Sequence, residues 1–163
     1  MPRMAKAYLS LGSNLDAAVH LRGAIDALRA EFGAIVLSPV YRTRAVGFDG
    51  NDFYNAAAVI ETGLEPQALN DWLHALEDAH GRDRSGPRYG DRTLDIDIVL
   101  FDDRALDGPG HLRIPRPELR HAFVLKPLAD IAPQALVPGT GSTLAQLWAA
   151  HAERDQPLER VEL

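Results

Sequence analysis

Four short segments of the chain have the apolar patterns of β-strands. In the first of them Ala7, Leu9 and Leu11 lie on one side, and the polar or aromatic residues between them lie on the other. The predicted strands cover residues 6–11, 35–41, 55–61 and 95–101. Pro39 has no N–H group for a sheet hydrogen bond, so it indicates an edge or a bulge in the second strand.

Two longer segments repeat apolar residues at spacings of three and four, which predicts helices with one buried face. The first helix carries its apolar stripe at Leu21, Ala24, Ile25 and Leu28. We expect the chain to turn over residues 12–14, with Ser13 or Asn14 as the helix cap, and the helix to end at Gly33. The second helix begins at Pro66, ends near Gly81 and buries Leu69, Trp72, Leu73 and Leu76.

The last third of the chain has shorter elements. Residues 102–117 are rich in turn formers, and a short helix over 118–125 is expected to break before Pro127. A final helix over 143–150 begins with a capping box, and residues 158–163 have a strand-like pattern. The order β-α-β-β-α-β predicts a single ferredoxin-like α+β domain over residues 1–163, with a mainly antiparallel sheet.

Two polar loops interrupt this pattern and are candidates for function. Residues 42–54 form a long connection rich in glycine, aspartate and asparagine, and such loops tend to be functional. Residues 82–92 carry Arg82, Arg84, Arg88 and Arg92. These arginines indicate a site for phosphate groups, whereas a solvated basic loop is the simpler interpretation.

The strand over residues 95–101 contains two acids where a sheet favours apolar side chains. Asp95 and Asp97 face the same way, with Cα atoms about 6.6 Å apart, while Ile96, Ile98 and Leu100 face the core. Neighbouring carboxylates repel each other unless a positive charge lies between them. Mg²⁺ accepts such oxygen ligands together with substrate phosphates. A solvated outer face explains the acids equally well, but the nearby arginine loop favours phosphoryl transfer.

Phe53, Asn55 and Phe123 allow two interpretations. An asparagine at a strand start can bind the edge of a heterocycle, and two phenylalanines can sandwich a flat ring. Each of them also suits an ordinary structural role, as a turn cap or a core residue. The pattern alone does not decide between these interpretations.

Composition narrows the class of protein. The net charge of −6 argues against a nucleic-acid binder, and the absence of cysteine excludes disulfides and thiolate chemistry. No apolar run approaches the roughly 20 residues of a membrane helix, and no cleavable leader is evident. We therefore expect a cytoplasmic protein that binds neither nucleic acid nor membrane.

Six segments together resemble the 6-hydroxymethyl-7,8-dihydropterin pyrophosphokinase family of folate biosynthesis. They are LSLGSNL (9–15), YRTRAVG (41–47), FYNAA (53–57), GRDRSGPRYGDR (81–92), TLDIDIVLF (93–101) and FVLKPLADIAP (123–133). The resemblance implies a three-layer α/β/α fold with helices on both faces of the sheet. It also implies transfer of pyrophosphate from ATP to the pterin hydroxymethyl group, with release of AMP.

The resemblance also implies roles for individual residues. Asp95 and Asp97 match the ligands of two Mg²⁺ ions, and Arg82 and Arg92 match catalytic arginines that grip the phosphates. The ATP site is implied at His74, Glu77, Arg84, Arg88, Ile98, Arg116 and His121. The pterin pocket is implied at Thr43, Val46, Phe53, Asn55 and Phe123.

Some positions depart from the family pattern. Arg116 stands where a phosphate-contacting histidine is usual, and either His121 or Arg120 stands where an arginine is usual. His74 replaces a usual glutamine. Two alternatives therefore remain: a divergent paralogue with another acceptor, and a nucleotide- or pterin-binding protein without catalysis. For each we expect ATP or a reduced pterin as the small-molecule partner, and we expect a monomer.

Overall fold

The computed structural model describes residues 4–43, 52–81, 93–108, 112–155 and 158–163. One antiparallel sheet has the strand order β10-β3-β4-β1-β5, and β2 also pairs with β4. Its strands are β1 (Ala5–Ser13), β2 (Val36–Leu37), β3 (Val40–Thr43), β4 (Phe53–Thr62), β5 (Asp95–Phe101) and β10 (Glu159–Val161). Two short hairpins lie outside it, formed by β6 (Leu106–Asp107) with β7 (Arg113–Ile114) and by β8 (Leu136–Val137) with β9 (Ser142–Thr143).

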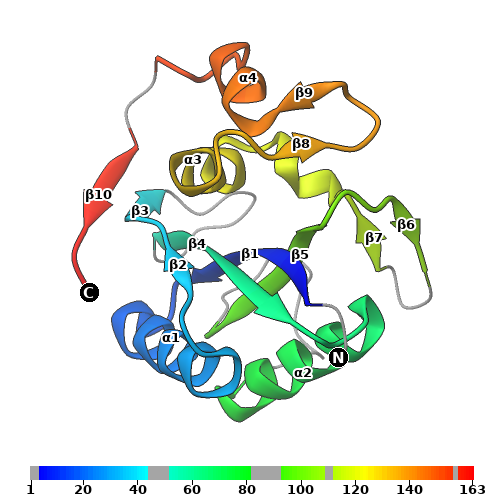
Figure 1. Ribbon diagram of the computed structural model, residues 1–163. Coiled ribbons are helices and arrows are strands. Elements are labelled where there is room, and N and C mark those ends of the chain that lie inside the picture. The colour runs from blue at the N-terminus through cyan, green and yellow to red at the C-terminus, as the bar shows by residue number, and fades with distance from the viewer. Residues whose placement is uncertain (1–3, 44–51, 82–92, 109–111, 156–157) are drawn as a thin grey trace.

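Helices cover both faces of this sheet, as expected (Figure 1). On one face α1 (Ala17–Phe32) and α2 (Pro66–Ala79) pack on the strands through residues such as Leu28 and Leu73. On the other face lie the 3₁₀ helix η2 (Pro117–Arg120), α3 (Ala122–Ile131) and α4 (Leu144–Ala149). The α+β fold with a mainly antiparallel sheet is confirmed. A single domain over the whole chain stays a prediction.

The face of each β5 residue follows from a bulge that the sequence pattern misses. Tyr8 pairs with Leu100 and Leu9 pairs with Ile98, so Val99 is an extra residue in β5. The bulge reverses the alternation: Ile98 packs in the core under α1 and α2, but Leu100 packs on the α3 side. The prediction that Leu100 shares a face with Ile98 is therefore wrong.

Other local predictions need correction at element ends. The predicted turn at 12–14 is wrong because β1 continues through Ser13, and Asp16 rather than Ser13 or Asn14 occupies the N-cap position of α1. The predicted strand over 35–41 is split into β2 and β3 at Pro39, while Arg42 and Thr43 extend β3 beyond the predicted loop start. The Gly33 helix end and the strand at the C-terminal tail are confirmed.

Pro127 lies inside α3 and does not break it. Its ring is buried among the apolar residues that α3 places on the sheet, including Val124 and Leu128. Burial of this face offsets the lost backbone hydrogen bond, so the predicted break before Pro127 is wrong. The capping box of α4 is confirmed, since Thr143 and Gln146 each bond the other's backbone N–H.

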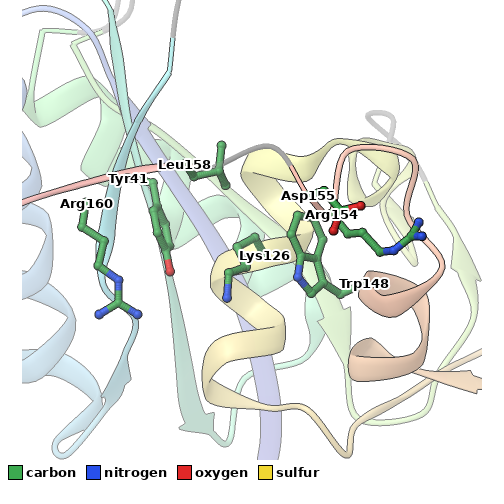
Figure 2. Close-up of a pocket in the computed structure, with 7 residues that line it drawn as sticks. All are labelled: Tyr41, Lys126, Trp148, Arg154, Asp155, Leu158 and Arg160. Atoms are coloured by element: carbon green, nitrogen blue, oxygen red, sulfur yellow. The ribbon is translucent and has the colours of Figure 1, made fainter.

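A surface concavity of about 320 Å³ lies where β3, α3, α4 and the C-terminal segment meet (Figure 2). Several of its polar groups have protein partners. The Tyr41 hydroxyl donates to Asp130, which also pairs with Lys126 at 2.5 Å. The Arg154 guanidinium donates to the His151 carbonyl at 3.1 Å. These contacts indicate a network that fastens α3 to the sheet. Among the described residues, no helix is long and apolar enough to cross a membrane.

Candidate active site

A row of residues across three strands forms the base of the candidate site. Gly12 in β1 pairs with Asn55 in β4 on one side and with Asp95 in β5 on the other. Asn55 and Asp95 lie on the sheet face that α3 partly covers, because their neighbours Ala56 and Ile96 pack on the opposite face. Adjacent strands are about 4.8 Å apart, so the backbones of Asn55 and Asp95 are roughly 10 Å apart, with only the side-chain-free Gly12 between them in the row.

Gly12 also sets the position of the Asn55 side chain. A Cβ atom at residue 12 would lie 3.1 Å from the Asn55 Oδ1 atom, which is closer than most such contacts. Asn55 is 5% exposed, and its side-chain amide donates to the Thr43 Oγ1 atom at 3.0 Å. Two of the residues implied for the pterin pocket are thus in direct contact. The Asn55 carbonyl oxygen lies over the glycine.

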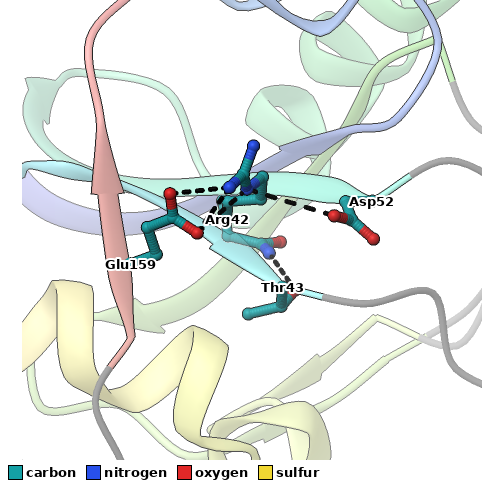
Figure 3. Close-up of polar contacts among 5 residues, drawn as sticks. Arg42, Thr43, Asp52 and Glu159 are labelled. Carbon is teal, nitrogen blue, oxygen red and sulfur yellow. Dashed lines mark hydrogen bonds and ion pairs between the residues drawn. The ribbon is translucent and has the colours of Figure 1, made fainter.

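Arg42 fastens the end of β3 from the exposed side (Figure 3). Its guanidinium donates two hydrogen bonds of 2.6 Å to the Glu159 carboxylate on β10 and lies 4.0 Å from Asp52. These groups are well exposed, so the ion pairs add little to stability. They do link β10 and the approach to β4 to the strand that carries Thr43.

The second acid of β5, Asp97, faces Arg116 from the segment before η2. Asp97 Oδ1 and an Arg116 terminal nitrogen are 3.4 Å apart, and about a quarter of each side chain is exposed. Arg116 also lies 3.2 Å from a carboxylate oxygen of Glu118. The backbone N–H of Arg116 donates to the carbonyl of Val99, the bulged residue. Glu118 is a site residue that the sequence analysis missed, and its spacing of two from Arg116 is the only signal it gives.

The electrostatics of Asp97 indicate a shortage of positive charge. Burial raises the pKa of Asp97 well above its usual value, and the neighbouring Asp95 raises it further. Arg116 opposes this effect, whereas Glu77 and Glu118 add to it. A carboxylate pair in this state has both the oxygen donors and the excess negative charge that a divalent cation needs.

Asp95 and Asp97 fit a Mg²⁺ ion that the protein and its substrate coordinate together. Within the described ranges, no group of three or more histidine, aspartate or glutamate side chains could hold a metal ion alone. Mg²⁺ is commonly bound by one or two carboxylates, with waters and substrate phosphates completing its coordination. Asp95 and Asp97 match that mode of binding.

Glu77 supports β5 from the opposite face of the sheet. Its side chain is 2% exposed at the end of α2, and its carboxylate accepts a 2.9 Å hydrogen bond from the backbone N–H of Ile96. β5 is the last strand in the sheet order, so this N–H lies on the outer edge of the sheet. Glu77 thus holds in place the strand that carries both acids.

The remaining predicted site residues in the described ranges have separate positions. His121 stacks on Phe123 with ring centroids 5.0 Å apart and an angle of 7° between the planes. Phe53 pairs with Thr43 across β3 and β4. Ile98 is 1% exposed on the α1 and α2 side, so a ligand on the other face could meet only its backbone. His74 is half-buried on α2.

Five predicted residues lie outside the described residues. They are Val46, Arg82, Arg84, Arg88 and Arg92.

Comparison with known proteins identifies the family. The profile of the 7,8-dihydro-6-hydroxymethylpterin-pyrophosphokinase (HPPK) family matches residues 8–133. The chain belongs to the HPPK family. The match runs from within β1 to just past the end of α3 and includes Gly12, Thr43, Asn55, Asp95, Asp97 and Arg116.

Relatives of the HPPK family cover nearly the whole chain. A 2-amino-4-hydroxy-6-hydroxymethyldihydropteridine pyrophosphokinase of Pseudomonas aeruginosa is 40% identical over 150 residues, which are 89% of this chain and 91% of that protein. An enzyme of the same name from Methylorubrum extorquens is 39% identical over 158 residues, 93% of this chain and 99% of the relative. These matches support the pyrophosphokinase interpretation and favour neither alternative.

Solved structures confirm the fold independently. The crystal structure of wild-type HPPK-DHPS from Plasmodium falciparum superimposes with a TM-score of 0.71 at 15% identity. The match covers 93% of this chain and 45% of that longer chain. At this identity the likeness concerns the HPPK fold alone.

Proposed function

We propose that this chain transfers the pyrophosphoryl group of ATP to the hydroxymethyl group of 6-hydroxymethyl-7,8-dihydropterin and releases AMP, in folate biosynthesis. Membership of the HPPK family supports the reaction. The row from Asn55 over Gly12 to Asp95 is the observation that carries the assignment of the site. Its two ends have different chemistries, an amide suited to a heterocycle and a carboxylate suited to a metal-bound phosphate.

The chain's own residues would position the two substrates. Asn55, held by Thr43, would bind the edge of the pterin, and Phe53 and Phe123 would stack on its ring. Since His121 now stacks on Phe123, the pterin would displace that imidazole or stack on the other face of the phenylalanine. Glu77 would act indirectly by fixing β5, and the predicted adenine contact of Ile98 would use its backbone.

Asp95 and Asp97 would hold Mg²⁺ against the phosphates, and the family resemblance implies two such ions. Bound there, Mg²⁺ would neutralise phosphate charge and make the attacking hydroxyl more acidic. Arg116 lies beside Asp97 and would bind a phosphate oxygen, as would Arg82, Arg84, Arg88 and Arg92 from the predicted loop. His74 and His121 complete the proposed ATP contacts, and Val46 completes the pterin pocket. A cytoplasmic monomer belongs to the same proposal.

The decisive experiment measures AMP formation with ATP, Mg²⁺ and the reduced pterin. We expect AMP to appear in step with the pyrophosphorylated pterin and to be absent when either the pterin or Mg²⁺ is omitted. AMP release that does not depend on pterin would point to another acceptor. Tight pterin binding without AMP release would point to a binding protein, and either result would contradict the proposal.

A second prediction concerns the Asn55 amide. We expect Asn55→Ala to raise the KM for pterin about 10- to 100-fold with a smaller change in kcat, because pterin groups left without a partner cost about 1–3 kcal/mol and each 1.4 kcal/mol is tenfold. Thr43→Val should act in the same direction, since it removes the acceptor of the Asn55 amide. Steady-state kinetics with varied pterin measures the effect.

Thr43→Ser is the matched control for this pair. It keeps the hydroxyl group that Asn55 contacts, so its KM for pterin should stay within about threefold of the parent value. This change is smaller than the one that loss of a net hydrogen bond would cause. If Thr43→Val and Thr43→Ser have equal KM values, the contact between Thr43 and Asn55 does not orient the amide for pterin.

A further inference from the structure

Arg116 lies between two acids that belong to different parts of the site. One terminal nitrogen lies 3.4 Å from Asp97 on β5, and Nε lies 3.2 Å from Glu118 on η2. A single guanidinium therefore shares its charge between a proposed metal ligand and an acid that the family resemblance does not assign.

The backbone at Arg116 is fixed, while its side-chain contacts are not optimal. Its N–H donates to Val99 and its carbonyl accepts from Leu119, both at 3.0 Å. By contrast, Arg116 Nε and Glu118 Oε2 are buried and close, but within the described part of the chain neither atom has a hydrogen-bond partner. The contact with Glu118 is thus a charge contact without hydrogen-bond geometry. Little is lost if the guanidinium rotates about it.

We propose that Arg116 is the resident cation of Asp97 in the metal-free protein, and that Glu118 is a positioning residue which retains Arg116 when a divalent cation takes over Asp97. This inference rests on the proposed function. In this exchange Asp97 gives up its contact with the Arg116 guanidinium and binds the metal ion instead. The released terminal nitrogens of Arg116 then bind an anionic phosphate oxygen of ATP. Glu118 keeps the guanidinium beside the acids throughout.

The exchange follows from charge and distance. A cation 3.4 Å from Asp97 competes with any second cation for the same carboxylate oxygen, because like charges at such distances repel. A guanidinium also has more donors than two acids use, and planar donors suit phosphate.

Binding of Mn²⁺, followed by loss of the electron paramagnetic resonance signal of the free ion, tests the exchange apart from turnover. We expect Arg116→Gln to tighten Mn²⁺ binding to the nucleotide-free protein about tenfold, which corresponds to about 1.4 kcal/mol of removed competition. Arg116→Lys keeps the positive charge, so its Mn²⁺ affinity should stay within about threefold of the parent affinity, a smaller change than the tenfold expected for Arg116→Gln. Glu118→Gln should weaken Mn²⁺ binding several-fold. Without the Glu118 charge the guanidinium pairs with Asp97 alone and competes more strongly with Mn²⁺ for that carboxylate.

Kinetics supply the second measurement. With Mg²⁺ saturating, Arg116→Gln should raise the KM for ATP, and Glu118→Gln should raise it less. Unchanged or weaker Mn²⁺ binding by a folded Arg116→Gln protein would overturn the exchange. If Arg116→Gln does not fold, Arg116→Lys and Glu118→Gln still decide, since equal Mn²⁺ affinities in those two variants would also overturn it.

Failure of this inference can be distinguished from failure of the proposed function. If the parent protein forms AMP but the variants do not differ in Mn²⁺ affinity, the proposed function is supported and the exchange at Asp97 is contradicted. If the parent protein forms no AMP but the Mn²⁺ affinities of the variants differ as stated, the proposed function is contradicted and the cation exchange at Asp97 is supported.

Discussion

Asp97→Asn should lower kcat by about a thousandfold or more while leaving the fold intact. A metal ion and its charge neutralisation contribute several kcal/mol to a phosphoryl-type transition state, and each 1.36 kcal/mol is tenfold in rate. The amide is nearly the same size as the carboxylate but carries no negative charge. AMP formation at saturating ATP, Mg²⁺ and pterin measures the effect.

The same substitution should raise the melting temperature of the metal-free protein. Burial and Asp95 raise the pKa of Asp97 in the folded state above the ordinary 3.8. As pH rises past 3.8, the unfolded chain ionises first, so the free energy of unfolding falls until pH passes the folded pKa. Asparagine does not ionise and avoids this loss. The Tm advantage of Asp97→Asn should therefore appear above pH 3.8, grow as the pH rises and level off once the pH passes the folded pKa of Asp97. An advantage of about 1 kcal/mol corresponds to roughly 2–4 °C.

Asp107→Asn is the matched control, because Asp107 is an exposed acid on β6 outside the site. It should change neither kcat nor Tm. Near-normal turnover of Asp97→Asn would remove the metal role of Asp97. A lower Tm at pH 8 would show that Arg116 stabilises the ionised acid by more than its burial costs.

The sequence predicts the α3 face of β5 correctly only up to the bulge. Alternation places Asp95 and Asp97 together and puts Ile96 and Ile98 in the core, as the structure does. Leu100 escapes the rule because the register with β1 shifts at Val99. A bulge is set by the pairing of two strands distant in sequence, so one strand's pattern cannot reveal it.

Local rules fail in a similar way at Pro127 and at the start of α1. Proline predicts a helix break, but tertiary burial of Pro127 on the sheet overrides that preference. Ser13 is an eligible cap, yet pairing with Tyr54 keeps it in β1, and the helix starts only after Asp16. In both cases contacts distant in sequence decide the local structure.

In the candidate site, too, the sequence predicts the local features but not the contacts between distant segments. Strand spacing alone predicts that two carboxylates are adjacent, and the family resemblance adds the residue roles. Neither predicts that Gly12 joins Asn55 to Asp95 in one row, nor that Glu118 shares Arg116 with Asp97. These relations depend on strand order and on the fold of η2 over the sheet.

Removal of the buried Glu77 carboxylate should destabilise the protein strongly. We expect Glu77→Ala to lower the free energy of unfolding by about 3 kcal/mol, because it leaves the buried N–H of Ile96 without its acceptor and opens a cavity in the core. Urea denaturation followed by circular dichroism measures this change. The loss falls on an edge strand, where no further strand of the described sheet can supply another acceptor.

Glu77→Gln distinguishes this structural role from direct contact with ATP. Glutamine keeps an oxygen that can accept from Ile96 and also fills the cavity that alanine leaves. It should therefore restore about half or more of the lost stability. Its kcat and its KM for ATP should then stay close to those of the parent protein. A Glu77→Gln protein that is as stable as the parent but has a much higher KM for ATP would instead require the Glu77 charge itself in nucleotide binding. In that case α2 would contribute to the ATP site directly and not only through β5.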